Sequence, residues 1–488
     1  MPEATPLSDT KRALLDRYLR GVGSDRTGTI QRRPPGSFAP LTVAQEELYR
    51  RELRVPRIPP LYNECVTLRM AGPLDVTALE RAFNEIIKRH EAWRTTFETK
   101  GGRPAQVVHP AMPLQLPVID LQGPPEAERE AALVRLVSED VRRPFDLRYG
   151  PLLRPKLVRI NETEHRLFLI AHQIILDGVS AYQIFPSELA TFYKDFSTGR
   201  SATLPELPVQ CADFACWQRE WLSGAAAKQV DYWRKQLGGE LLALSWPVKP
   251  RPVTASFRGC IQSFSFPKRL SERIKELSRR LSTTLFLVLL AGLATVLHRY
   301  TKQKEIVLGT LSPSGRKRSE VMGLLGYFLN PVALRLSFHD GMRFRELLLQ
   351  AQRVLLEAMC NDDVPIERLA RELKGADDSS PSPFFTAAIS LQPPMPNLDL
   401  AWKVTTMDVE SGGSPWDFYL AFIDRPEGLI GRAQFHPDLF DQATVGSALQ
   451  DLQEVLGNAS LESVVTSARI RADEESATSA AGAKRSTV

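Results

Sequence analysis

A short polar cluster after an apolar segment is the first place in this sequence where chemistry could occur. The apolar run RLFLIA at 166–171 is typical of a strand buried on both faces, and it leads directly into His172. Gln173, Asp177 and Gly178 follow shortly after. Polar groups at the end of a buried strand are costly unless they are paired, so the cluster is either a hydrogen-bonded structural turn or a functional site. The spacing alone favours the structural turn.

The surrounding sequence predicts the strands and helices that would hold this cluster. Periodicity and turn residues in the first half predict strands at Leu61–Ala71, Thr95–Glu98, Ala105–Val108, Leu153–Ile160 and His165–Ala171, and helices after Asp75, over Glu126–Val141 and over Ala181–Phe196. The order recurs in the second half, with strands Ile261–Phe266, Glu305–Thr310, Phe385–Leu391, Phe418–Ile423 and Gly428–Phe435, and helices Leu270–Leu281, Phe344–Met359 and Asp441–Leu456. We therefore expect two similar α+β halves joined by a bridge rich in proline and aromatic residues, although no exact repeat supports this.

The composition of the 488-residue chain excludes several classes of protein. Apolar residues make up 43% and charged residues 24%, which are ordinary globular values and exclude a disordered, collagen-like or coiled-coil protein. The net charge of +5 is too small and too dispersed to indicate a nucleic-acid partner. The five cysteines are sparse and form no CxxC pair, so we expect reduced thiols, no metal site and a cytoplasmic location.

One apolar segment resembles a membrane span in composition but is too short. The sequence LFLVLLAGLATVL at 285–297 is bounded by polar residues, whereas a spanning helix needs about 20 apolar residues. The segment therefore predicts a helix that is buried on all sides in a large core. We expect no association with a membrane, and the first residues show no apolar segment like that of a secretory signal.

The segment around the polar cluster resembles a known signature. HQIILDGVS at 172–180 is similar to the HHxxxDG signature of the condensation domains of nonribosomal peptide synthetases, a family related to chloramphenicol acetyltransferase. Other blocks of that family have counterparts here in the same order: LTVAQEELY at 41–49, RHEAWRTTF at 89–97, CADFACWQREWL at 211–222, GTLSPSGRKRSEVMGLLGYFLNPVALR at 309–335, DDVPIERLARELK at 362–374, SPSPFFTAAISLQ at 380–392 and GLIGRAQFHPDLFD at 428–441. On these blocks the chain is identified as a member of this family.

The resemblance implies an α+β fold of two chloramphenicol-acetyltransferase-like lobes, which form a V-shaped pseudo-dimer around a central tunnel. We expect the first lobe over residues 37–215 and the second over residues 216–465. Residues 1–36, with a possible amphipathic helix at Leu7–Leu19, are expected to be a docking or linker segment, and packing on the main body is the alternative. Residues 466–488 are expected to be a flexible tail.

The resemblance also implies a reaction. The amine of a downstream aminoacyl group attacks an upstream acyl or peptidyl thioester, an amide forms, and the upstream carrier leaves as a thiol. Both substrates arrive on phosphopantetheine arms at opposite mouths of the tunnel. The implied partners are an upstream acyl or peptidyl carrier protein, a downstream peptidyl carrier protein and an adenylation domain. The isolated domain is expected to be a monomer that holds no cofactor, metal or nucleic acid.

The resemblance places the catalytic centre at His172, Gln173, Asp177 and Gly178. His172 takes a position that usually makes structural hydrogen bonds, and Asp177 is expected to form a buried ion pair with Arg316. The backbone amide of Gly178 is expected near the reaction centre, at the start of a helix whose N-terminal amides suit a developing oxyanion. Four further residues are expected to contact the tunnel or the substrate: Arg94, Ser180, Asn330 and Trp416.

Gln173 departs from the family, because the second histidine of the signature, usually described as a general base, is glutamine here. A glutamine amide hydrogen-bonds but does not take a proton near neutral pH. Either positioning of two tethered reactants suffices for catalysis, or the domain has lost its chemistry and recruits a partner enzyme or gates carrier proteins. Because Asp177, Gly178 and Arg316 are retained, we favour the enzyme. An ester-forming acyltransferase of the same superfamily is a further alternative.

Two smaller departures bear on the donor. Asn330-Pro331 replaces the usual Asn-Thr of the family, and PPLYNECVTLRM at 59–70 is more distinctive than the usual strand. Both look like condensation domains of mixed polyketide–peptide assembly lines. We therefore expect either a polyketide-type acyl donor or neutral variation at these positions.

Overall fold

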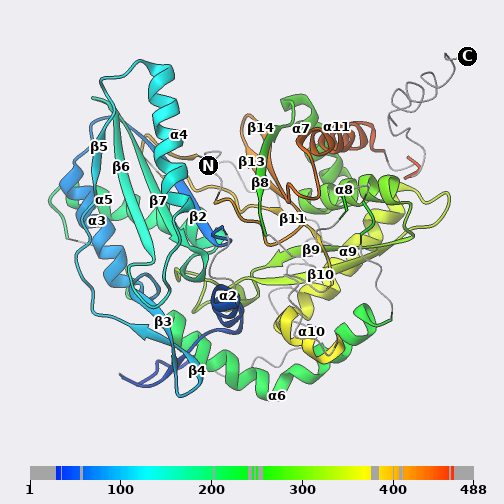
Figure 1. The fold of residues 1–488 in the computed structure, drawn as a ribbon, viewed down its shortest axis with the longest axis horizontal. Coiled ribbons are helices and arrows are strands. Elements are labelled where there is room, and N and C mark those ends of the chain that lie inside the picture. Colours follow the sequence, from blue (N-terminus) through cyan, green and yellow to red (C-terminus); the bar gives the residue numbers. More distant parts are fainter. Residues whose placement is uncertain are drawn as a thin grey trace, which may run out of the picture.

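The computed structural model of the chain describes residues 29–34, 36–54, 59–201, 204–239, 244–246, 249–250, 257–374, 384–398, 400–405, 409, 411–460 and 463–465. They form two α+β bodies that lie side by side and are joined along one edge by a long helix (Figure 1). The predicted helix Leu7–Leu19 and the predicted tail 466–488 lie outside the described residues.

The first lobe is built on a five-stranded sheet with the order β12-β2-β7-β6-β5. Its strands are β2 (Asn63–Ala71), β5 (Val118–Asp120), β6 (Leu153–Asn161), β7 (Glu164–His172) and β12 (Trp402–Thr405). Helices α3 (Val76–Arg89) and α5 (Phe185–Ser197) cover one face of the sheet, and α4 (Glu126–Arg142) covers the other. Successive side chains of β2 and β7 point to opposite faces of the sheet, so neighbouring residues pack into different cores.

Sequence signals account for the main elements of this lobe. The Asp75 side chain caps α3 by accepting a hydrogen bond from the backbone N–H of Ala78, at 3.0 Å. Apolar residues at helical spacing, such as Leu79 and Phe83, then face the sheet and are fully buried. A small second sheet of β1 (Ala39–Pro40), β3 (Thr95–Lys100) and β4 (Arg103–Val108) extends from this lobe.

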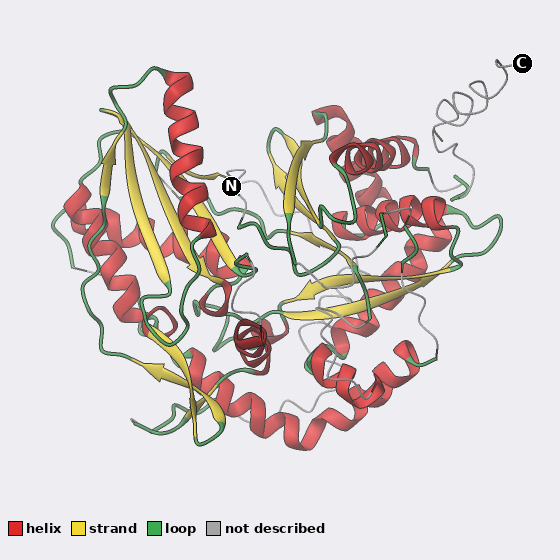
Figure 2. Cartoon of the chain, in the orientation of Figure 1, coloured by secondary structure: helices red, strands yellow, loops and turns green. Residues whose placement is uncertain are grey.

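The second lobe is built on a six-stranded sheet with the order β10-β9-β11-β13-β14-β8. Its strands are β8 (Cys260–Ser265), β9 (Glu305–Ser312), β10 (Asn330–Ser337), β11 (Ala387–Leu391), β13 (Phe418–Arg425) and β14 (Gly428–Phe435). Helices α7 (Lys268–Arg280), α8 (Leu285–Thr301), α9 (Phe344–Cys360) and α11 (Gln442–Asn458) gather around this sheet (Figure 2). Helix α10 (Ile366–Lys374) lies instead where the lobes meet, since its Glu367 is 3.7 Å from Arg51 of the first lobe.

The apolar segment at 285–297 is a core helix, as the sequence predicts. Every residue of α8 from Leu287 to Leu297 is buried against the sheet and the neighbouring helices. Among the described residues no single helix has the length and apolar composition to cross a membrane, although α7 and α8, which meet at 109°, pass that test as a bent pair.

The two lobes are interleaved, so the predicted boundary at 215/216 needs correction. It falls inside α6 (Cys211–Leu237), a continuous helix that begins in the core of the first lobe and ends in the core of the second. Strand β12, from the second half of the sequence, completes the sheet of the first lobe by pairing with β2. Hydrophobic residues of the segment 321–328 also pack into the first core. Shared burial, rather than sequence order, defines each lobe.

The end of the predicted docking segment 1–36 is also part of the folded body. Ile30 is buried in the core of the first lobe. The guanidinium of Arg33 forms ion pairs with Glu91 at 2.7 Å and with Asp213 at 2.9 Å. Buried apolar surface and shielded ion pairs fix these residues, which therefore do not belong to a free linker.

Candidate functional site

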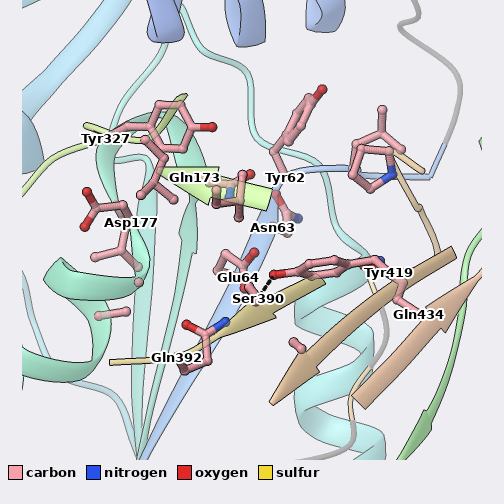
Figure 3. Close-up of a pocket in the computed structure, with 18 of the residues that line it drawn as sticks. Tyr62, Asn63, Glu64, Gln173, Asp177, Tyr327, Ser390, Gln392, Tyr419 and Gln434 are labelled. Carbon is pink, nitrogen blue, oxygen red and sulfur yellow. Dashed lines mark hydrogen bonds between the residues drawn. The ribbon is translucent and has the colours of Figure 1, made fainter. Parts of the chain in front are cut away.

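A cavity of about 350 Å³ lies between the lobes and is lined by residues of both. The first lobe contributes β2 and the segment after β7, and the second contributes β9–β11, β13 and β14. Figure 3 shows Gln173 and Asp177 on one side of the cavity and Ser390 and Tyr419 on another. Of the eight sequence-predicted residues in the site, five line it: Gln173, Asp177, Gly178, Asn330 and Trp416.

The loop after β7 is fixed to the neighbouring strand. The backbone N–H of Gln173 donates a hydrogen bond to the carbonyl oxygen of Tyr62, at 2.7 Å. His172 is 2% exposed, and its Nδ1 accepts a hydrogen bond from the backbone N–H of Ile174, at 3.1 Å. Its Nε2 lies 3.4 Å from a carboxylate oxygen of Glu52. Since His172 does not line the cavity, its placement in the catalytic set is corrected to a structural position that caps the turn.

Gln173 begins the short helix η2 (Gln173–Ile175), and its side chain faces the cavity (Figure 3). Within the described part of the chain, its side-chain amide makes no hydrogen bond. A primary amide offers one acceptor oxygen and two donor hydrogens, so this group can orient a bound amine or carbonyl without titrating.

The ion pair between Asp177 and Arg316 is present and buried. The Arg316 guanidinium donates from Nη2 to Oδ1 of Asp177 at 2.8 Å and from Nε to Oδ2 at 3.0 Å. The two side chains are 0% and 6% exposed. Asp177 also accepts hydrogen bonds from the backbone N–H of Ser180 at 2.8 Å and of Phe328 at 3.2 Å. This bidentate, fully hydrogen-bonded arrangement is the geometry in which a buried ion pair is tolerated, and it connects the two halves of the sequence.

Gly178 starts the helical segment that leads into the short π-helix η3 (Ser180–Ile184) and then α5. An added Cβ at Gly178 would lie 2.9 Å from the side-chain oxygen of Gln392, a residue that follows β11 of the second lobe. The first amides of a helix have no partner within the helix and carry partial positive charge. The site therefore combines a close approach of the two lobes with backbone donors at the cavity wall.

Two predicted tunnel residues do not line the cavity. Ser180 is fully buried, and its hydroxyl accepts from Arg316 Nη2 at 2.7 Å and donates to the carbonyl of Gly326 at 3.0 Å. Arg94 lies on the short helix η1 (Glu91–Arg94), where its guanidinium donates to the carbonyl of His109 beside β4. Neither side chain lines the cavity and each hydrogen-bonds to other protein groups, so both tunnel assignments are corrected.

Asn330 and Trp416 do line the cavity, from the second lobe. The Asn330 amide donates to the carbonyls of Asp362 at 2.7 Å and Val364 at 3.0 Å, so its side chain also fixes the chain before α10. Trp416 packs its ring on Tyr419, with 5.0 Å between centroids. These contacts give the second-lobe wall a rigid aromatic surface.

Charged residues that the sequence analysis did not select also line the cavity. Arg51 of α2 (Val43–Arg54) donates from Nε to Glu47 at 2.6 Å and lies 3.7 Å from Glu367. Burial, reinforced by the nearby Glu47, raises the pKa of Glu367 to about 7. Glu64 of β2 and Arg432 of β14 face the cavity from opposite lobes. The sequence contains a signal for Glu64, because strand alternation places this acidic residue on the same face as the apolar Val66 and Leu68. Arg432 does not interrupt an apolar face in this way.

Comparisons with known proteins agree with this architecture. A profile of the family described as "Condensation domain" matches residues 36–475. A linear gramicidin synthase of Brevibacillus parabrevis is 38% identical over 434 residues, which are 88% of this chain and 6% of that protein. The chain therefore spans only a small part of this curated relative.

Solved structures share the fold. The X-domain from teicoplanin biosynthesis superposes with a TM-score of 0.77 at 25% identity, over 91% of this chain and 100% of that one. The first condensation domain of the calcium-dependent antibiotic synthetase, solved with a substrate analogue, gives a TM-score of 0.78 at 21% identity, over 90% and 100% of the two chains. The predicted two-lobed α+β fold is confirmed. The chain belongs to the condensation-domain family of nonribosomal peptide synthetases.

Proposed function

We propose that this domain joins a carrier-bound upstream acyl or peptidyl thioester to the amine of a downstream carrier-bound aminoacyl group, forming an amide. The observation that carries this proposal is the cavity shared by the two lobes, into which Gln173 and Gly178 face while the Asp177–Arg316 ion pair holds their loop. Both substrates would enter on phosphopantetheine arms, so the domain itself needs no cofactor. The partners would be an upstream carrier protein, a downstream carrier protein and its adenylation domain.

Positioning supplies most of the catalysis in this proposal. Holding two reactants in line is worth about 7–11 kcal/mol, whereas a general base typically contributes about 10²–10⁴-fold. A free α-amine with a pKa of about 7.7–8.0 is already partly deprotonated near neutral pH. The Gln173 amide would orient this amine, and the backbone amides at Gly178 would stabilise the oxyanion of the tetrahedral intermediate.

Mass spectrometry of intact carrier proteins tests the proposal. Donor carriers loaded with a polyketide-type acyl chain or with a dipeptidyl group are mixed with acceptor carriers loaded with each of the proteinogenic amino acids. We expect the domain to raise the yield of amide-linked acceptor carrier above a control that lacks the domain, for at least one pair. Acceptors bearing a hydroxyl in place of the amine distinguish ester formation. The donor that reacts faster separates a polyketide-type chain from a peptidyl chain.

A recruiting role is the second candidate, and a specific similarity favours it. The X-domain from teicoplanin biosynthesis, similar to this chain over most of its length, has been solved in complex with a second protein of that biosynthesis, OxyB. A domain of this kind would bind a third protein and leave carrier-bound substrates unchanged. Amide yield at the level of the domain-free control, together with specific binding of a tailoring enzyme, would support this role over amide formation.

A further inference from the structure

Glu64 places a carboxylate in the cavity at a position that the proposed mechanism does not yet use. It lies on β2, directly opposite Ala171 of β7. Its strand neighbours on the same face, Val66 and Leu68, are buried under α3 and α5, but Glu64 lies beyond them and keeps exposed surface. Glu64 lines the cavity between the lobes, and Figure 3 shows its side chain pointing into it.

The register places Glu64 close to Gln173. Asn63 pairs with His172, Glu64 pairs with Ala171, and the backbone N–H of Gln173 donates to the carbonyl of Tyr62 at 2.7 Å. Gln173 directly follows the last residue of β7, and Figure 3 shows its side chain and that of Glu64 in the same cavity. One substrate group in the cavity can therefore lie within reach of both side chains.

Within the described residues, the Glu64 carboxylate has no hydrogen-bond or ion-pair partner. The charged group that faces it is Arg432 of β14, whose Nη2 donates to the carbonyl of Val409 at 3.1 Å and whose buried Nε has no described partner. Burial raises the pKa of Glu64, and the positive charge of Arg432 opposes this rise.

Three further titratable side chains lie close enough to Glu64 to feel its charge, and they are neutral at physiological pH. They are Tyr182 of η3, Tyr419 of β13 and Cys65 of β2. Burial raises the pKa of each, to about 12 for Tyr419 and Cys65 and higher still for Tyr182. The other carboxylates that line the cavity have cationic partners, Arg316 for Asp177 and Arg51 for Glu47 and Glu367. Among the described residues, Glu64 is therefore the cavity carboxylate that no ion pair occupies.

We propose that the Glu64 carboxylate contacts the attacking amine and takes its proton, which Gln173 cannot do. This inference rests on the proposed amide-forming function. The nitrogen lone pair forms a bond to the thioester carbonyl carbon, and the carbon–sulfur bond breaks with its electrons on sulfur. The proton lost by nitrogen passes through Glu64 to the thiolate, so the upstream carrier leaves as a thiol and the carboxylate is regenerated. The negative charge of Glu64 also stabilises the positive charge that develops on nitrogen.

Glu64→Gln tests this assignment, because it keeps the shape and the hydrogen-bonding capacity of the side chain but removes its charge and basicity. The matched control is Glu98→Gln on β3, a half-exposed carboxylate that lies 3.0 Å from Lys100 and does not line the cavity. With the reactive carrier pair found above, we expect Glu64→Gln to lower the rate of amide formation at least tenfold at pH 7. The control should react like the wild type, and both variants should stay folded.

A rescue separates a chemical role from a structural one. In the double variant Glu64→Gln/Gln173→His, a histidine with an ordinary pKa of about 6.5 occupies position 173, which lines the same cavity as position 64. We expect this double variant to recover at least part of the lost rate, with a new dependence on pH near that value. When Glu64 is present, the single substitution Gln173→His should change the rate much less than it does in Glu64→Gln, because Glu64 already takes the proton.

The outcomes are distinguishable. If the wild type forms an amide and Glu64→Gln forms it at the same rate, the assignment of Glu64 is wrong, while the proposed function stands. If Glu64→Gln loses activity but the histidine variant restores none, Glu64 has a structural or binding role and the assignment is also wrong. If the wild type forms no amide with any pair in the panel, the proposed function fails and the inference fails with it.

Discussion

Two pairs of opposite charges lie near the loop after β7, and they differ in how completely they are paired. Asp177 and Arg316 share two direct hydrogen bonds, are almost fully buried and have further partners in the backbone. Glu64 and Arg432 come from opposite lobes, face the same cavity and do not contact each other within the described residues. The polar groups of the first pair are all hydrogen-bonded within the protein, so this pair stabilises the cavity wall. The second pair still has polar groups that can bind a substrate.

Removing one partner of the fully hydrogen-bonded pair Asp177–Arg316 should have the largest effect on stability. In Asp177→Ala, the guanidinium of Arg316 stays buried without its anion, and losing one partner of a buried ion pair costs about 3–5 kcal/mol. We expect a clear fall in melting temperature and in soluble yield. Asp146→Ala, which removes an exposed carboxylate 2.7 Å from Arg148, is the control and should leave both unchanged. A fully stable and fully active Asp177→Ala variant would contradict the role given to this pair.

Arg33, which also forms shielded ion pairs, gives a second test, in which a smaller loss of stability is expected. Arg33→Ala removes ion pairs to Glu91 and to the buried Asp213, although Asp213 keeps a hydrogen bond from the backbone N–H of Gln210 at 2.8 Å. We expect a loss of about 1–3 kcal/mol in the free energy of unfolding. Chemical denaturation measures it, with Arg32→Ala, which removes a more exposed guanidinium, as the comparison. An unchanged midpoint would show that residues 29–34 are, after all, only a linker.

The side-chain amide of Gln173 makes no hydrogen bond within the described residues, so replacing it should have a smaller effect than breaking a buried ion pair. Gln173→Ala removes one hydrogen bond to the bound amine, which is worth on the order of 1 kcal/mol, or about fivefold in rate. Between pH 6.5 and 9, the rate should rise as the acceptor amine loses its proton, with no titration from position 173. Single-turnover kinetics with loaded carriers gives both quantities. A loss of a hundredfold or more would mean that Gln173 takes part in more than orientation.

Glu64→Gln should stabilise the fold slightly, which is the smallest effect and opposite in sign to the first. The pKa of Glu64 is raised in the folded state, so the folded protein binds this proton more tightly than the unfolded chain does. Ionisation therefore costs stability, and this cost is absent below the unfolded pKa and complete above the folded one. We expect the melting temperature of Glu64→Gln to exceed that of wild type at neutral pH and to match it in acid. A lower melting temperature at pH 7 would indicate that the carboxylate is needed for folding.

The sequence predicted the elements whose signals are local. Strands β2 and β7, the capped helix α3 and the core helix α8 each show a clear period or a continuous apolar run, and each is found where it was expected. Strand β12 was missed because its four residues gain their place only by pairing with β2, far away in the chain. The continuous α6 was divided at 215/216 because sequence order does not show that one helix enters two cores.

The site residues show the same difference between local and long-range signals. Asp177, Gly178 and Gln173 could be placed because they share one short loop, and the partner Arg316 came only from the family resemblance, since it lies 139 positions away. Ser180 and Arg94 were assigned to the tunnel although they face other partners, because a motif gives the order of residues and not the direction of their side chains. Glu64 was visible as an acidic residue on an apolar strand face, but only the structure shows that this face continues into the cavity.

Helix α6 has a mechanical consequence. Its 27 residues extend over about 40 Å, with one end packed in each hydrophobic core. Figure 1 shows that α6 does not run straight but curves beneath both lobes, so its bend fixes where one core lies relative to the other. A rotation of one lobe against the other would have to change this bend or pull one end of α6 out of its core. The width of the cavity is therefore tied to the curvature of a single helix.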